Sequence, residues 1–126
     1  LIKTFKLEEV LKQKAKTLSG GYMRKLSIAI SLINDPKILF LDEPTLGLDV
    51  LSRKELWNTI NTLKGKITII LTTHYMEEAE SLSDRVAIMN KGNIIEIGTP
   101  KEIISKTKTK NMEDAFVCLI TGGKDE

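Results

Sequence analysis

Two short, largely apolar runs, Ile38–Leu41 and Ile67–Thr72, dominate the pattern of apolar and polar positions along the chain. Each run is continuous and not alternating, which is typical of a strand that is buried on both faces of a parallel sheet. The roughly two dozen residues between the runs have the length of a helical crossover, which predicts a right-handed βαβ unit. Both strands should therefore end at the same edge of one sheet.

Apolar residues at helical spacing predict the elements around these strands. The expected helices cover residues 6–16, 22–34, 50–64, 76–82 and 111–121, and a further helix begins at Pro100. Residues 86–89 and 94–97 predict a β-hairpin, because Gly92 in the segment between them suits a tight turn. The pattern as a whole predicts an α/β fold in which helices flank a largely parallel sheet.

Composition and charge exclude several classes of protein. A length of 126 residues with 41% hydrophobic residues is ordinary for a soluble globular domain. The net charge of +2 comes from 19 basic and 17 acidic residues that are mixed along the chain, so no nucleic-acid partner is predicted. No apolar stretch approaches the roughly 20 residues of a membrane span, and the amino terminus lacks the pattern of a signal peptide. We therefore expect a cytoplasmic chain without a membrane span of its own.

Polar residues that could bind a ligand or take part in catalysis follow both predicted strands. Asp42 and Glu43 come directly after the first strand, and His74 comes shortly after the second. Ligands of parallel sheets bind beyond the carboxyl ends of the strands, and two adjacent carboxylates at such a place favour a divalent cation. Alternatively, the acidic pair caps a helix and the histidine is a polar cap.

A second candidate site lies at the start of the helix expected near Tyr22. Ser19, Gly20 and Gly21 precede it, so free backbone N–H groups, the positive end of the helix dipole and a serine hydroxyl would meet there. Such a helix start suits a phosphate group. The alternative is a flexible loop in which Ser19 acts as the N-cap.

These motifs, in their order along the chain, resemble the second half of a nucleotide-binding domain of an ABC transporter. Leu18–Gly21 (LSGG) resembles the signature motif, Ile38–Glu43 (ILFLDE) the Walker B motif, Leu48–Asp49 the D-loop and His74 the switch histidine. The resemblance covers essentially the whole chain, whose end resembles that of drug exporters and other ABC-2 type exporters. It implies a partial P-loop NTPase fold.

The resemblance also implies a role for each site residue. Asp42 would hold Mg²⁺ through water, Glu43 would orient and deprotonate the attacking water, and His74 would contact the γ-phosphate of ATP. The signature residues would act on the ATP of a neighbouring domain, and Asp49 would bridge the two domains. These signature residues are Leu18, Ser19, Gly20, Gly21 and Tyr22, the last of which stands where the commonest signature has glutamine.

Two motifs of the family are absent from these 126 residues: a phosphate loop of the form G-x-x-x-x-G-K-[ST], and the glutamine loop that precedes the signature. We therefore expect an amino-terminally truncated domain. Residues 1–35 would be a remnant of the helical subdomain, and residues 36–126 would run from Walker B to the carboxyl terminus. The chain alone is expected to be inactive as an ATPase.

The function implied by the resemblance is that of an ATP-hydrolysing subunit of an ABC exporter. Its cofactors would be ATP and Mg²⁺, and its partners a second nucleotide-binding domain and a transmembrane permease at the cytoplasmic face of the membrane. The missing phosphate loop keeps an alternative open, a non-catalytic partner that supplies only a signature face to an intact domain.

The missing loop also affects the expected sheet. In the family, the strand that carries the phosphate loop lies between the strand before His74 and the strand that begins near Val86. Without it, we expect these two strands either to pair directly or to leave an edge that is covered by self-association.

Overall fold

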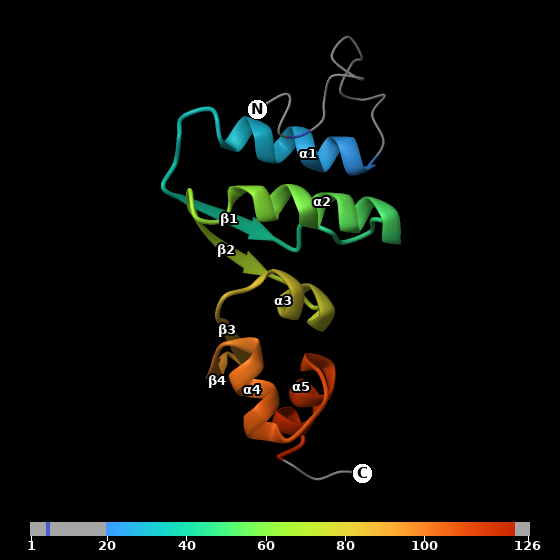
Figure 1. Cartoon of the computed structure of the whole chain (residues 1–126), viewed down its shortest axis with the longest axis vertical. Coiled ribbons are helices and arrows are strands. Elements are labelled where there is room, and N and C mark those ends of the chain that lie inside the picture. The colour runs from blue at the N-terminus through green and yellow to red at the C-terminus, as the bar shows by residue number, and fades with distance from the viewer. Residues whose placement is uncertain (1–4, 6–19, 123–126) are drawn as a thin grey trace. The chain divides into compact units, whose positions relative to one another are not determined.

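The computed structural model describes Phe5 and residues 20–122 (Figure 1). The helix expected at residues 6–16 lies outside the described part. The chain divides into two compact units, residues 1–72 and 73–126.

The first unit contains two helices and two strands: α1 (Gly20–Ser31), β1 (Ile38–Asp42), α2 (Val50–Leu63) and β2 (Thr68–Thr72). The strands are parallel and in register from Ile38 opposite Thr68 to Asp42 opposite Thr72, which confirms the predicted βαβ unit. Both strands therefore end at one edge. The buried apolar side chains of these elements are Ile28, Ala29, Leu39, Leu41, Leu56, Trp57, Ile60 and Leu63.

The burial of β1 differs from the prediction. Leu39 and Leu41 are buried, whereas Ile38 is 53% exposed and Phe40 is 71% exposed. Successive side chains of a strand point to opposite faces, so only one face of β1 packs into the core of this unit. The continuous apolar run indicated two covered faces, and within the described residues only one is covered.

The limits of α1 also differ from the prediction of a helix over residues 22–34. The helix begins at Gly20, so both glycines of the signature form part of its first turn. It ends at Ser31, where the N–H groups of Leu32 and Ile33 donate to carbonyls three residues earlier and tighten the last turn.

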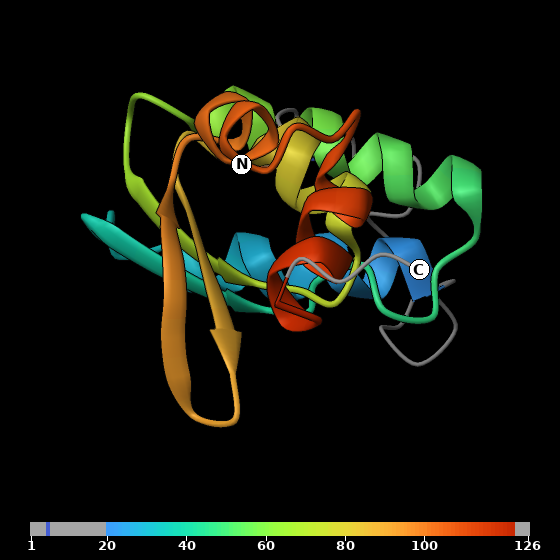
Figure 2. The same cartoon turned by 90° about the horizontal axis from the view of Figure 1, so that it is seen from below.

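The second unit contains α3 (Met76–Leu82), β3 (Val86–Asn90), β4 (Asn93–Gly98), α4 (Pro100–Thr107) and α5 (Met112–Ile120). Strands β3 and β4 form the predicted antiparallel hairpin, whose turn projects away from the helices of the unit in Figure 2. Its turn residues Lys91 and Gly92 have φ angles of 50° and 81°, the left-handed conformation that suits a two-residue turn. The core of the unit consists of Ile88, Ile103, Met112 and Ala115.

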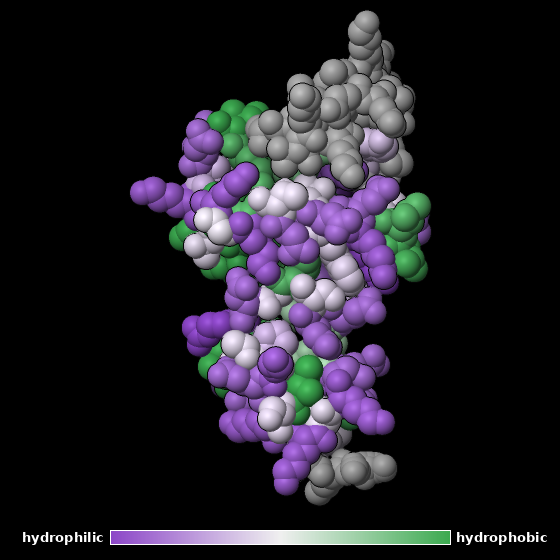
Figure 3. All heavy atoms as spheres, in the orientation of Figure 1, coloured by the Kyte–Doolittle hydropathy of each residue, from purple (hydrophilic) through white to green (hydrophobic). Residues whose placement is uncertain are grey.

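The two pairs of strands form separate two-stranded sheets, β1 with β2 and β3 with β4. The direct pairing of β2 with β3, which was one of two expected outcomes, is therefore not present among the described residues. On the face of the molecule shown in Figure 3, polar side chains predominate and apolar ones form small separate patches. None of the described helices is long and apolar enough to cross a membrane.

Candidate functional site

The acidic pair lies at the shared end of the two parallel strands. Asp42 ends β1 opposite Thr72, which ends β2, and the Thr72 hydroxyl donates a hydrogen bond to Oδ1 of Asp42. One step further, the N–H of Glu43 donates to the carbonyl of Thr72 at 2.8 Å. The strand ladder thus continues to Glu43, and Thr72 fixes the orientation of the Asp42 carboxylate while Asp42 itself stays exposed.

Directly after the strand, the chain turns sharply at Glu43. This residue has a φ angle of 46°, and its carbonyl accepts the N–H of Leu46 at 3.2 Å. A left-handed conformation costs a residue other than glycine roughly 1–2 kcal/mol, so the surrounding contacts must stabilise it. Thr45, within the turn, is buried, and its carbonyl accepts the N–H of Leu48 at 3.1 Å.

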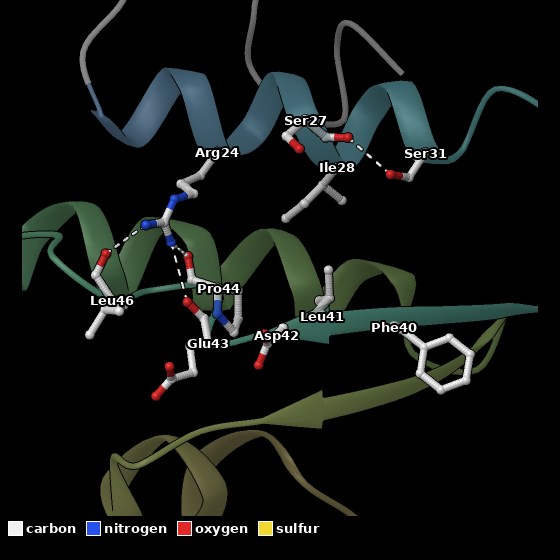
Figure 4. Close-up of a pocket in the computed structure, with 10 residues that line it drawn as sticks. All are labelled: Arg24, Ser27, Ile28, Ser31, Phe40, Leu41, Asp42, Glu43, Pro44 and Leu46. Atoms are coloured by element: carbon white, nitrogen blue, oxygen red, sulfur yellow. Dashed lines mark hydrogen bonds between the residues drawn. The ribbon is translucent and has the colours of Figure 1, made fainter.

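Arg24 of α1 supplies the contact that holds this turn. Its guanidinium donates to the carbonyl of Glu43 at 3.3 Å, to the carbonyl of Pro44, and to the carbonyl of Leu46 at 2.7 Å (Figure 4). A hydrogen bond from a charged donor is worth roughly 1.5–3 kcal/mol. The bonds from Arg24 therefore help to offset the cost of the left-handed Glu43.

A pocket of about 370 Å³ opens beside these residues. Its lining comes from α1, from β1 and from the turn after β1: Arg24, Ser27, Ile28, Ser31, Phe40, Leu41, Asp42, Glu43, Pro44 and Leu46 (Figure 4). The acidic pair therefore borders a hollow at the carboxyl end of a parallel strand, which is the place where α/β sheets bind ligands.

The signature residues lie only partly within the described chain, because Leu18 and Ser19 fall outside it. Gly20, Gly21 and Tyr22 form the start of α1. A Cβ atom added to Gly20 would lie 3.5 Å from Cδ2 of Leu48, which is ordinary van der Waals contact. The start of α1 and the expected D-loop are thus neighbours.

Asp49, in the expected D-loop, is the N-cap of α2. Its Oδ1 accepts the N–H of Ser52 at 2.7 Å. This backbone hydrogen bond, followed by one from the Ser52 hydroxyl, lowers the pKa of the Asp49 carboxyl below its ordinary value of 3.8. The predicted contact of Asp49 across a dimer stays a prediction.

His74 belongs to the second unit, two residues beyond the end of β2. The N–H of Tyr75 donates to the Thr73 hydroxyl at 2.9 Å, which shapes the turn in which His74 lies. The predicted convergence of His74 with Glu43 on one ligand stays a prediction.

Sequence reasoning missed two residues of this site, Thr72 and Arg24. Thr72 could have been found, because aligning the ends of two parallel strands places it opposite Asp42. Arg24 carries no such signal, since a single arginine on a helix is usually solvated.

Fold and site together define a class: an α/β protein with a fixed acidic pair at the carboxyl end of a parallel strand, where such sheets bind their ligands. Comparison with known proteins is more specific. A family model described as ABC transporter matches residues 1–46. The chain belongs to the nucleotide-binding domains of ABC transporters, as its relatives and structural neighbours show.

Among curated relatives, ABC transporter A family member 9 of Arabidopsis thaliana is 49% identical over 99% of this chain and 13% of its own length. The Daunorubicin resistance ATP-binding protein DrrA3 of Streptomyces coeruleorubidus is 42% identical over 85% of this chain and 34% of its own length. The chain thus spans only a small part of the length of these relatives.

Solved structures agree with this assignment. The ATP-binding subunit of an ABC transporter covers 94% of the chain with a TM-score of 0.75 and 29% identity, and the chain covers 51% of that structure. An ATP-binding cassette of an ABC transporter also covers 94%, with a TM-score of 0.79 and 28% identity, and the chain covers 46% of it. The predicted α/β fold, a part of an ABC ATPase domain, is confirmed.

Proposed function

We propose that the chain forms part of the ATP-hydrolysing subunit of an ABC transporter that drives export across a membrane. The observation that carries this proposal is the acidic pair Asp42–Glu43, held at the end of β1 by Thr72 and Arg24 and bordering a pocket. The relatives named as ABC transporters and as an ATP-binding resistance protein support it.

In this proposal the two carboxylates have different tasks. Glu43 orients a water molecule and accepts its proton as the water attacks the γ-phosphate of ATP. Asp42 holds the cation site, and the Thr72 hydroxyl keeps its carboxylate in one orientation. His74 contributes a hydrogen bond to the γ-phosphate, so that positioning and charge stabilisation lower the barrier.

The residues at the strand end fit a magnesium ion that is bound mainly through water and phosphate. No cluster of three or more His, Cys, Asp or Glu that could enclose a metal occurs among the described residues. Mg²⁺ needs no such cluster, because it keeps several waters and uses one or two carboxylates with the phosphates of the substrate. Bound there, Mg²⁺ would neutralise charge on the phosphates, and Asp42 would hold it through water.

The start of α1 serves a second nucleotide in this proposal. Ser19 and Gly21 bind the γ-phosphate of an ATP molecule that a partner domain holds. Leu18, Gly20 and Tyr22 complete the signature motif, of which Gly20, Gly21 and Tyr22 lie in the first turn of α1. Leu48 and Asp49 lie at the same interface. The partners are a second nucleotide-binding domain and a transmembrane permease, which places the subunit at the cytoplasmic face of the membrane.

The substitution Glu43→Gln in the full-length protein tests this function. ATP binding should stay within about twofold, while hydrolysis should fall by roughly 10²–10⁴-fold, the usual contribution of a general base. Steady-state turnover and equilibrium nucleotide binding measure the two effects. Glu77→Gln, an exposed carboxylate in the first turn of α3, is the matched control and should leave both unchanged.

Unchanged turnover in Glu43→Gln would remove Glu43 from the role of base. Absence of hydrolysis in the full-length wild-type protein with its partner domain would instead favour the non-catalytic alternative.

A further inference from the structure

We propose that Arg24 is a positioning residue for the general base Glu43, an inference that rests on the proposed function. Arg24 would act through the main chain, because it fixes the turn from which the Glu43 carboxylate projects. It takes no direct part in the chemical step.

The hydrogen bonds of Arg24 define this role. Its Nη1 donates to the carbonyls of Glu43 and Pro44, and its Nη2 donates to the carbonyl of Leu46 at 2.7 Å. All of these acceptors are main-chain oxygens of one turn. Figure 4 shows the Glu43 carboxylate on the side of the turn that faces away from the guanidinium. These bonds of Arg24 therefore hold the backbone of the base, on the side of the turn opposite to its carboxylate.

The turn needs such a support because of its conformation. Glu43 has a φ angle of 46°, which residues other than glycine rarely adopt, and it directly follows the last residue of β1. If the turn relaxed toward an ordinary φ angle, the carboxylate would swing away from its place at the strand end. A misplacement of about 1 Å in a catalytic group can cost roughly 10²-fold in rate.

Arginine is suited to this task and lysine is not. A planar guanidinium presents several N–H donors in a fixed fork, so it can bond to three carbonyls of one turn at the same time. A lysine ammonium would keep the charge, yet it is a compact group that cannot span the same acceptors. Arg24→Lys therefore separates the fork geometry from the charge.

The test uses Arg24→Lys and Arg24→Ala in the full-length protein, each alone and combined with Glu43→Gln. We expect kcat to fall roughly 10–100-fold in both single variants, while the Kd for ATP changes by less than about threefold. In the Glu43→Gln background, the Arg24 substitutions should cause no further loss, because the residue acts only through the base.

Lys54→Ala is the control, since it removes an exposed cation of α2 that does not line the pocket. It should keep the wild-type kcat. Thermal unfolding of each variant separates positioning from stability: Arg24→Lys should melt within a few degrees of the wild type despite its lower kcat.

Two results would overturn the inference. One is a wild-type kcat in Arg24→Lys and Arg24→Ala, and the other is a loss of kcat that multiplies with that of Glu43→Gln. If Glu43→Gln itself hydrolyses ATP normally, Glu43 is not the base and the inference falls with that role. If the full-length wild-type protein with its partner domain hydrolyses no ATP, the proposed function fails, and that outcome is distinguishable because it involves no variant.

Discussion

At the scale of single residues, Asp49 shows how one carboxylate can be fixed by the helix that it begins. The N–H of Ser52 donates to its Oδ1 at 2.7 Å, and the N–H of Arg53 donates to its carbonyl at 2.9 Å. The first bond satisfies a donor in the first turn of α2 that has no partner within the helix, and the second is the first regular hydrogen bond of the helix. The hydrogen bonds from Ser52 favour the charged carboxylate, so the pKa of Asp49 is lower in the folded chain than in the unfolded chain.

This pKa difference predicts a pH dependence of stability. The contribution of the charged cap is complete above the unfolded value of 3.8 and is lost as the pH falls through the lower folded value. Asp49→Asn keeps a capping oxygen but does not titrate. The difference in melting temperature between wild type and Asp49→Asn should therefore be constant from pH 5 to 7 and should change only at acid pH, below about 4. A difference that stays constant down to pH 2 would contradict the assignment.

The residues that could be predicted at this scale are those whose chemistry is local. Asp42 and Glu43 stand at the end of an apolar strand, so the adjacent sequence alone places them at the edge of the sheet. Arg24 could not be predicted, because its role depends on a turn about twenty residues away and on the exact path of α1. A long side chain on a helix is compatible with many partners, and only the tertiary structure selects one.

At the scale of elements, α1 and α2 are joined by Lys25. This side chain is buried, its Nζ lies 3.7 Å from Oε2 of Glu55 on α2, and it lies 5.0 Å from the centroid of the Tyr22 ring. Glu55 is half exposed, so the ion pair is partly screened by water and contributes little net stability. The ammonium itself is nevertheless removed from water, which makes its partners necessary.

This arrangement predicts unequal effects on stability when the two partners are replaced. Glu55→Gln should destabilise the protein by roughly 1–2 kcal/mol, because it leaves a buried ammonium with a weaker partner. Lys25→Met keeps a similar length without a charge, so it should be neutral within about 1 kcal/mol. Denaturant unfolding measures both, with Lys54→Met on the exposed side of α2 as the control. A larger loss in Lys25→Met than in Glu55→Gln would contradict this account.

The elements themselves follow closely from the sequence, and the deviations have physical causes. Residues 76–82 form a helix as predicted, and Gly92 forms the predicted turn, because acidic residues in the first turn of a helix and glycine in a tight turn act locally. The burial of β1 was predicted wrongly, since a continuous apolar run shows that two faces can be covered but not which elements cover them. Phe40 remains 71% exposed for that reason.

At the scale of the whole molecule, the strand β2 carries an edge without a partner among the described residues, because it pairs only with β1. In a parallel ladder, the N–H and C=O groups of one residue point to one neighbour, and those of the next residue point to the opposite side. Thr68 and Thr72 bond to the β1 side. By alternation, the main-chain groups of Ile69 and Leu71 point outward. The exposed face of the β1–β2 sheet carries apolar side chains, including Ile70 at 45% exposure.

An open edge on an uncharged strand segment such as residues 68–71 is a template for another chain, and we predict that the 126-residue chain self-associates there. Light scattering should show oligomers, and the amides of Ile69 and Leu71 should be protected from exchange until dilution separates the chains. Ile70→Lys should yield a monomer, because a charge on this face opposes edge pairing. The control Ile30→Lys changes an exposed residue of α1 and should leave the oligomer intact. A cooperatively folded wild-type monomer whose Ile69 and Leu71 amides exchange freely would contradict the predicted self-association.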